Sequence, residues 1–289
     1  MQSDLNSVCS RQSSLERGKN LSPTIAHGIK RQLELNTMMP NCTGPTAQPW
    51  FPFGPQALES GRRMFCLPFA GGGASAFLGW RNTLPGTDVV PVQYPGHETR
   101  IEEKCASGLA TLVEELAQAL APWLDEPYAL FGCSMGARIA FALAHHLAGG
   151  GRPPPAALCV AAHPPPDAAA MPPVATLSDA QLESRLRRYG GTAEALLADA
   201  ELTRVMLPIL RADLALAEQP VPREPLPCPI NAFAGRQDFF APPAAMAGWQ
   251  RFTRGSFTLH DFPGGHFFFR TAEEFLPALD RSVRAAFNR

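Results

Sequence analysis

An excess of charge of one sign is missing from this sequence. Twenty-five Lys and Arg residues stand against 26 Asp and Glu residues, which leaves the 289-residue chain with a formal net charge of −1 at pH 7. A protein that binds nucleic acid or an anionic membrane needs a field of basic side chains to hold the phosphates. The sequence therefore predicts neither nucleic acid nor a membrane as a partner.

Long apolar runs and a secretory leader are missing as well. No stretch reaches the roughly 18 uninterrupted apolar residues that mark a transmembrane helix. Residues 1–19 are mainly polar and contain no apolar segment behind a basic start. Together these absences predict a cytoplasmic protein.

Paired cysteines are also absent. The seven cysteines are widely spaced and form no C-x-x-C pair, and several lie in apolar runs, as Cys66 does between Phe65 and Leu67. An odd number with this spacing is typical of reduced thiols in a core. We therefore expect no disulfide framework and no metal site.

Lysine is scarce, and its distribution marks a change of composition near residue 60. Two of the three lysines, Lys19 and Lys30, lie in the first 60 residues, together with four of the seven asparagines. This segment shows no sustained periodicity of apolar residues, so it cannot bury enough surface to offset the chain entropy lost on folding. We expect residues 1–60 to be a disordered extension, or to reflect a mis-assigned start codon, with residues 50–53 able to pack on the domain. Residues 61–289 are expected to form one domain.

Strand-like and helix-like patterns alternate after this head, which predicts an α/β class domain with a mostly parallel sheet flanked by helices. Strands are predicted at 63–69, 88–93, 128–132, 157–162, 230–234 and 256–262. Helices are predicted at 109–120, 135–147 and 272–286. Residues 165–225 break the alternation, with helical patterns at 179–189, 192–199 and 201–218. We expect a helical lid there, although enlarged crossover helices are an alternative.

A G-x-S-x-G pattern at 132–136 carries the main chemical signal. It lies between a predicted strand and a predicted helix, where two glycines permit a sharp turn that exposes the hydroxyl of Ser134. The helix N-terminus aims backbone N–H groups toward the same point. Ser134 is therefore the candidate nucleophile.

A serine nucleophile needs a base and an acid that orients the base. His266 follows a Gly-Gly pair just past the last strand, and Asp238 follows the strand at 230–234. The order Ser134, Asp238, His266 is the nucleophile, acid, base order of α/β-hydrolases. Asp167, after the strand at 157–162, is the rival acid.

Donors for the oxyanion are expected from two backbone positions. The N–H of Met135 follows the nucleophile, and the N–H of Ala70 lies in a Gly-rich loop after the first strand. That loop lacks the spacing of either nucleotide-binding glycine motif. We therefore expect no cofactor.

Several segments together resemble one family from about Arg63 to the C-terminus. They are 68–72 (PFAGG), 93–100 (QYPGHETR), 132–137 (GCSMGA), 207–213 (LPILRAD), 235–238 (GRQD) and 264–267 (GGHF). In these the chain resembles type II thioesterases of polyketide and nonribosomal peptide synthesis. The resemblance implies an α/β-hydrolase fold with a mobile lid. It also implies hydrolysis of stalled or misprimed acyl thioesters on the phosphopantetheine arm of acyl or peptidyl carrier proteins.

One residue departs from the family pattern, because Cys133 replaces the usual His before the nucleophile. We expect its side chain to point away from the reaction side and to change packing rather than activity. We also expect a monomer. Alternatives are a general serine esterase or lipase and a chain-releasing acyltransferase of the same fold. A non-catalytic docking protein would require a broken triad.

The lid raises two further questions. Apolar residues that either line an acyl site or form the core of the lid are Leu196, Leu197, Met206, Leu210, Phe267 and Phe268. Candidate contacts for an acidic carrier protein are Arg185, Arg187, Arg188, Arg204 and Arg211.

Overall fold

The computed structural model describes residues 49–53, 61–80, 83–168, 171–190 and 197–288. The chain divides into two units, Met1–Thr43 and Gly44–Arg289, and every described residue belongs to the second. Most of residues 1–60, for which the sequence predicts disorder, therefore lie outside the described residues. Only residues 49–53 of that segment are described.

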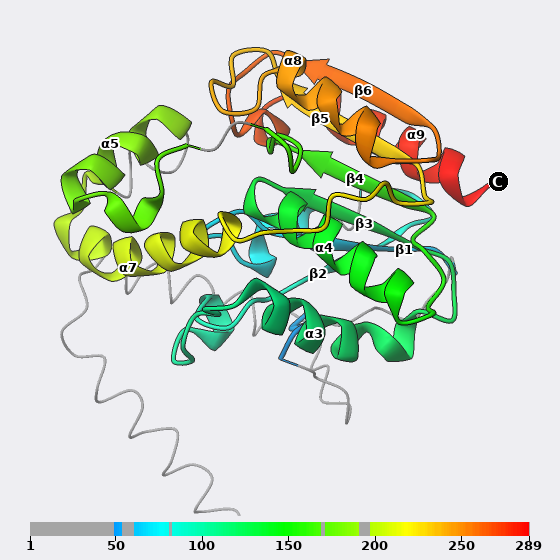
Figure 1. Ribbon diagram of the computed structural model, residues 1–289, viewed down its shortest axis with the longest axis horizontal. Helices are drawn as coiled ribbons and strands as arrows, with labels where there is room; N and C mark the ends of the chain where they lie inside the picture. The colour runs from blue at the N-terminus through cyan, green and yellow to red at the C-terminus, as the bar shows by residue number, and fades with distance from the viewer. Residues whose placement is uncertain (1–48, 54–60, 81–82, 169–170, 191–196, 289) are drawn as a thin grey trace, which may run out of the picture. The chain divides into compact units, whose positions relative to one another are not determined.

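Six parallel strands form the sheet, in the order β2-β1-β3-β4-β5-β6 (Figure 1). The strands are β1 (Arg63–Leu67), β2 (Asp88–Pro91), β3 (Tyr128–Cys133), β4 (Ala157–Ala161), β5 (Ile230–Gly235) and β6 (Phe257–Phe262). Because β1 is followed by β2 on one side and by β3 on the other, the strand order reverses between β1 and β3. In open parallel sheets a ligand site lies at the carboxyl ends of the strands at such a reversal.

Successive side chains of the strands bury themselves on opposite faces of the sheet. Phe65, Leu130 and Val160 share one cluster with α3 (Leu109–Leu120) and α4 (Met135–Gly149). Met64 and Phe131 share another cluster on the opposite face. That cluster, here called the cluster of the α9 face, includes residues of η1 (Ala74–Trp80) and α9 (Phe275–Phe287). Both faces are therefore covered, as a parallel sheet requires.

Short elements complete the fold around these layers. They are η2 (Glu98–Arg100), η3 (Ala121–Trp123), η4 (Val174–Thr176), α8 (Pro243–Met246), η5 (Ala247–Phe252) and η6 (Phe268–Arg270). No described helix combines the length and apolar character needed to cross a bilayer.

An aromatic segment ahead of β1 packs into the domain. Trp50 and Phe51 are buried members of the core cluster, and the Phe51 ring lies 5.9 Å from that of Phe65. The N–H of Gln93 donates to the carbonyl of Trp50 at 2.8 Å, and the Arg100 guanidinium lies 4.6 Å from the Trp50 ring centroid. The packed domain thus includes residues upstream of 61, where the change in composition placed its start.

The insertion between β4 and β5 is helical, as the sequence predicts. Its described helices are α5 (Asp179–Tyr189) and α7 (Ala200–Ala217), which lie beyond the carboxyl ends of the strands (Figure 1). A capping box of Ser178 and Gln181 begins α5, and the Asp199 carboxylate caps α7. The helix expected at 192–199 lies largely outside the described residues. We call α5, α7 and η4 the lid.

Candidate active site

Ser134 occupies a strained turn between β3 and α4. Its φ of 52° and ψ of −123° fall in a region that L residues rarely adopt. A Cβ on Gly132 would lie 2.2 Å from the carbonyl oxygen of Gly136, and one on Gly136 would lie 2.1 Å from that of Leu67. Both glycines are therefore required for the chain to turn so tightly, which presents the Ser134 side chain at the strand ends.

His266 joins the two other polar groups into one hydrogen-bonded chain. Its Nε2 lies 3.0 Å from Ser134 Oγ, and its Nδ1 lies 2.9 Å from Asp238 Oδ2. The other oxygen of Asp238 accepts the N–H of Phe240 at 2.9 Å. All three side chains are buried: Ser134 is 9% exposed, and Asp238 and His266 are each 3% exposed. With the Nδ1 proton facing the carboxylate, Nε2 is free to accept the serine proton.

A close approach of two loops brings Asp238 and His266 together. A Cβ on Gly235 would lie 2.3 Å from the carbonyl oxygen of Gly265, so the glycine at the end of β5 is needed. The Gln237 N–H donates to the Gly264 carbonyl at 3.0 Å, and the Gly264 N–H donates to Gln237 Oε1 at 2.5 Å. These bonds fix the acid loop against the base loop.

Asp238, and not its rival Asp167, is the carboxylate that contacts His266 in the structure. Asp167 accepts hydrogen bonds from Arg251, with Nη2 2.8 Å from Oδ2, in a surface ion pair.

His163 is buried with Nδ1 2.7 Å from the Pro164 carbonyl, and burial lowers its pKa to about 3. Cys133 is fully buried in the cluster of the α9 face, so its side chain points away from the site as expected.

The oxyanion donors expected from the sequence are the backbone N–H groups of Ala70 and Met135. Neither the N–H of Ala70 nor that of Met135 donates to any described residue. Met135 begins α4, whose first N–H groups have no partner within the helix. Both groups are therefore available for an external acceptor.

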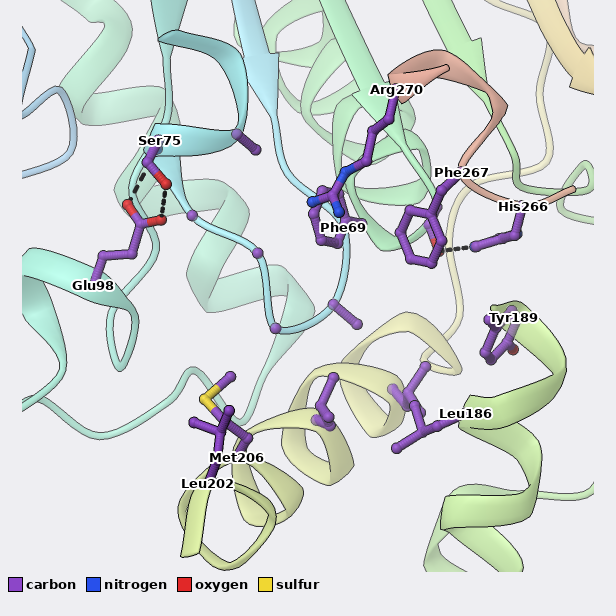
Figure 2. A pocket seen from close by; sticks show the side chains of 18 residues that line it. Phe69, Ser75, Glu98, Leu186, Tyr189, Leu202, Met206, His266, Phe267 and Arg270 are labelled. Carbon is purple, nitrogen blue, oxygen red and sulfur yellow. Dashed lines mark hydrogen bonds between the residues drawn. The ribbon is translucent and has the colours of Figure 1, made fainter. Parts of the chain in front are cut away.

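A cavity of about 300 Å³ opens beside Ser134 and His266 (Figure 2). One wall is the Gly-rich loop with Phe69 and Phe267, and the facing wall consists of lid side chains. The lid residues that line it are Leu186, Tyr189, Leu202, Met206, Leu210 and Leu214. Figure 2 shows Tyr189 beside His266, and their ring centroids are 4.6 Å apart. Apolar walls of this kind suit an acyl chain.

The lining settles most of the question about the lid residues. Met206 and Phe267 line the cavity, whereas Phe268 is buried in the cluster of the α9 face. Leu210 does both, because it lines the cavity and belongs to the core of the lid. Leu197 packs on that core, and Leu196 lies outside the described residues.

Within the described ranges, no three His, Cys, Asp or Glu side chains are grouped so as to hold a metal ion.

A family model for the thioesterase domain matches residues 62–285. The chain belongs to the thioesterase family. Thioesterase PikA5 of Streptomyces venezuelae is 39% identical over 216 residues, which cover 73% of this chain and 77% of PikA5. The RedJ thioesterase of the prodiginine pathway of Streptomyces coelicolor has a TM-score of 0.73 at 36% identity, with 84% of this chain and 96% of RedJ covered.

A second solved structure points the same way. BorB, described as the type II thioesterase of the borrelidin biosynthetic cluster, has a TM-score of 0.71 at 35% identity. The match covers 82% of this thioesterase and 98% of BorB. The resemblance drawn from the sequence motifs is thus confirmed, and so is the fold.

Sequence reasoning named Met206 and Leu210 among the lid residues at the site, but it missed others, among them Tyr189. Tyr189 beside His266 lies at the end of a helix with no motif around it. His97 and Asp213 lie in the 93–100 and 207–213 segments, but 116 residues of chain separate the two side chains that meet. The motifs marked both segments, and only the fold shows that they meet.

Proposed function

We propose that this thioesterase hydrolyses acyl groups from the phosphopantetheine arm of carrier proteins in polyketide or nonribosomal peptide synthesis, and so clears stalled or misprimed chains. The observation that carries the proposal is the buried Ser134–His266–Asp238 chain of hydrogen bonds at the edge of an apolar cavity. The chain belongs to the thioesterase family and is similar to a type II thioesterase, and both facts support the proposal that its substrate is bound to a carrier protein.

The reaction proceeds in two steps on these residues. Ser134 Oγ attacks the thioester carbonyl while His266 Nε2 accepts its proton, and the N–H groups of Ala70 and Met135 stabilise the oxyanion. The C–S bond breaks, and His266 protonates the leaving thiol. Water then attacks the acyl-enzyme with His266 as base, which releases the acid and restores Ser134. Asp238 holds the imidazole in the required tautomer throughout.

The cavity indicates acyl groups of modest size. Its volume of about 300 Å³ is at the small end of the range of roughly 300–1,000 Å³ for ligand sites. Tyr189 and Phe267 flank His266 and limit the access of water. A short acyl group or starter unit fits such a site better than a complete polyketide.

Docking of the carrier is proposed on the exposed basic residues of the lid. Arg187, Arg188 and Arg204 are exposed there. Arg185 is buried, donates to the Pro172 carbonyl and lies 3.5 Å from Glu218. Arg211 donates to backbone carbonyls within the lid and to Asp179. These last two arginines hold the lid together, which removes them from the candidate contacts.

The test compares one acyl group on three leaving groups: an acyl-loaded carrier protein, an acyl-N-acetylcysteamine thioester and a p-nitrophenyl ester. We expect the highest kcat/KM for the carrier and free acid as the product by mass spectrometry. An ester rate that equals or exceeds the carrier rate would identify a general esterase. Acylated amine or alcohol as the main product would identify an acyltransferase.

A further inference from the structure

In the Gly-rich loop at residues 69–75, here called the oxyanion loop, hydrogen bonds hold four backbone N–H groups, those of Gly71, Gly72, Ala74 and Ser75. The Gly72 N–H donates to the Phe69 carbonyl at 2.9 Å. Side-chain oxygens accept two more N–H groups: Gln93 Oε1 takes that of Ala74, and Glu98 Oε2 takes that of Ser75. The dashed lines of Figure 2 show Glu98 and Ser75 joined in this way.

The fourth of these N–H groups is held by the lid. The Gly71 N–H donates to Asp213 Oδ2 at 2.7 Å, and Asp213 lies on α7. Gly71 directly follows Ala70, whose N–H donates to no described residue. Asp213 therefore fixes the peptide next to the expected oxyanion donor.

His97 fixes Asp213 in turn. Its Nε2 lies 2.8 Å from the same Oδ2, and its Nδ1 lies 2.9 Å from the Pro95 carbonyl. Both ring nitrogens face acceptors, so both carry protons and the ring is a cation. Burial lowers the pKa of His97, but the hydrogen bond and charge of Asp213, together with the Pro95 carbonyl and the charge of Glu98, leave the pKa above its ordinary value. The result is a buried ion pair, with Asp213 only 4% exposed.

Packing adds a second link between α7 and the loop. Gly71 has a φ of +72°, and a Cβ there would lie 2.7 Å from Leu210 Cδ2 on α7. Helix α7 thus rests directly on Gly71 through an apolar contact and a charged hydrogen bond. Displacement of α7 removes the acceptor of the Gly71 N–H and releases the part of the loop around Ala70 and Gly71.

We propose that Asp213, oriented by His97, is a positioning residue that couples the lid to the oxyanion hole, so that the Ala70 N–H is aimed at the oxyanion only while α7 is seated on the loop. The inference rests on the proposed function of Ser134 and Ala70. It predicts that Asp213 contributes to the transition state and not to binding of the ground-state acyl chain. Lid closure and completion of the catalytic site are then one event.

The test separates this role from a merely structural ion pair. Kinetics are measured on the acyl-N-acetylcysteamine thioester, together with two affinities for the same acyl chain. One ligand is a trifluoromethyl ketone, which forms a tetrahedral oxyanion on Ser134. The other is a thioether, which forms none and reports ground-state binding.

For Asp213→Ala we expect kcat and ketone affinity to fall by a common factor of about 10 to 100, somewhat less than the loss of a whole oxyanion donor. Thioether affinity is expected to stay within about threefold. Asp213→Asn retains an oxygen for the Gly71 N–H but loses the charge that holds His97, so its selective loss is expected to be about three- to tenfold.

The matched control is Glu218→Gln. Glu218 caps the C-terminus of α7, accepts the Val174 N–H and lies beside Arg185. The substitution removes a charge inside the lid but keeps an oxygen for the Val174 N–H and removes neither contact of α7 with Gly71. Its ratio of ketone to thioether affinity is expected to equal that of the wild type. Equal losses of both affinities in the Asp213 variants would overturn the proposal.

The experiment distinguishes failure of the proposed role of Asp213 from failure of the proposed thioesterase function. If Asp213→Ala does not fold, an unchanged kcat and ketone affinity in folded Asp213→Asn overturns the coupling. If the wild-type protein neither hydrolyses the thioester nor binds the ketone at Ser134, the proposed function fails. Wild-type activity with no selective loss in the variants refutes only the role of Asp213.

Discussion

The sheet with its flanking helices and the lid over its edge are built differently. Strand side chains such as Phe65, Phe131 and Phe233 are fully excluded from solvent. The core of the lid is a five-residue cluster in which Leu207 and Leu210 each keep 8% of their surface exposed. Ser134 lies in the sheet region, between β3 and α4, whereas one wall of the cavity and Asp213 belong to the lid.

Apolar and polar contacts join the lid to the rest, and Leu216 of α7 is buried in the core cluster that α3 and α4 share. Arg138 on α4 donates to the Gln219 carbonyl at 2.7 Å just past α7, and Gln219 Oε1 accepts the N–H of Leu109 at 2.7 Å. A single hydrogen bond contributes only about 0.5–1.5 kcal/mol net. Because the core of the lid is small, we expect the lid to open locally at lower cost than the sheet. The comparison teaches that the rigid region performs the reaction and that the lid controls when the site is complete.

The largest effect is expected from removing the nucleophile of the rigid region. Ser134→Ala should lower kcat by about 10⁴-fold or more, because the triad acts as a unit. The melting temperature should not fall, since the strained turn tolerates a smaller side chain. Steady-state kinetics with acyl-loaded carrier protein, together with a thermal melt, make the measurement. Turnover near that of the wild type would remove Ser134 from the mechanism.

The acid provides the next contrast within the same region. Asp238→Asn should lower kcat by about 10⁴-fold, because only a carboxylate holds the imidazole in the right tautomer. The matched variant is Asp167→Asn, which breaks a surface ion pair with Arg251 and should leave kcat within about twofold. Both are measured on the same thioester. The reverse ranking would contradict the assignment of the acid.

A smaller effect on stability should come from the aromatic segment ahead of β1. A protein that begins at residue 48 keeps Trp50, Phe51 and Phe53, and we expect it to retain its melting temperature. One that begins at residue 61 loses these buried rings, at a cost of at least about 3–5 kcal/mol of unfolding free energy. Its melting temperature should fall by about 10 °C. Equal stability of the two proteins would show that the segment adds nothing to the core.

The smallest effect concerns the surface of the lid. Arg187→Glu with Arg188→Glu should raise KM for the acyl-loaded carrier about three- to tenfold and leave the small thioester unchanged, with the difference shrinking as salt rises. The control reverses Arg254 and Arg281, which are exposed outside the lid. Equal effects on both substrates, or an equal effect of the control, would place the docking face elsewhere.

Local sequence patterns predicted most of the rigid region. The helix at 109–120 matches the structure, and the strand expected at 63–69 ends at Leu67, just before Pro68. The triad could be predicted because each member follows a strand end and the order along the chain restricts the choice. Parallel strands then bring their carboxyl ends to one edge without further information.

The contacts of the lid could not be predicted in the same way. Arg185 and Arg211 have the same charge as Arg187 in the sequence, and only their neighbours Pro172 and Val174 show that they act inside the lid. The pairing of His97 with Asp213 joins two segments whose approach depends on how α7 packs. Contacts between distant segments follow from tertiary packing, which periodicity does not specify.

Covalent labelling tests the central claim most directly. The thioesterase is treated with a fluorophosphonate that carries a short acyl-like chain, with and without acyl-loaded carrier protein as a competitor, and peptides are mapped by mass spectrometry. We predict one adduct per chain on Ser134, activity lost in proportion to labelling, and slower labelling in the presence of the carrier. An adduct on another residue, or full thioesterase activity with Ser134 fully labelled, would contradict the account.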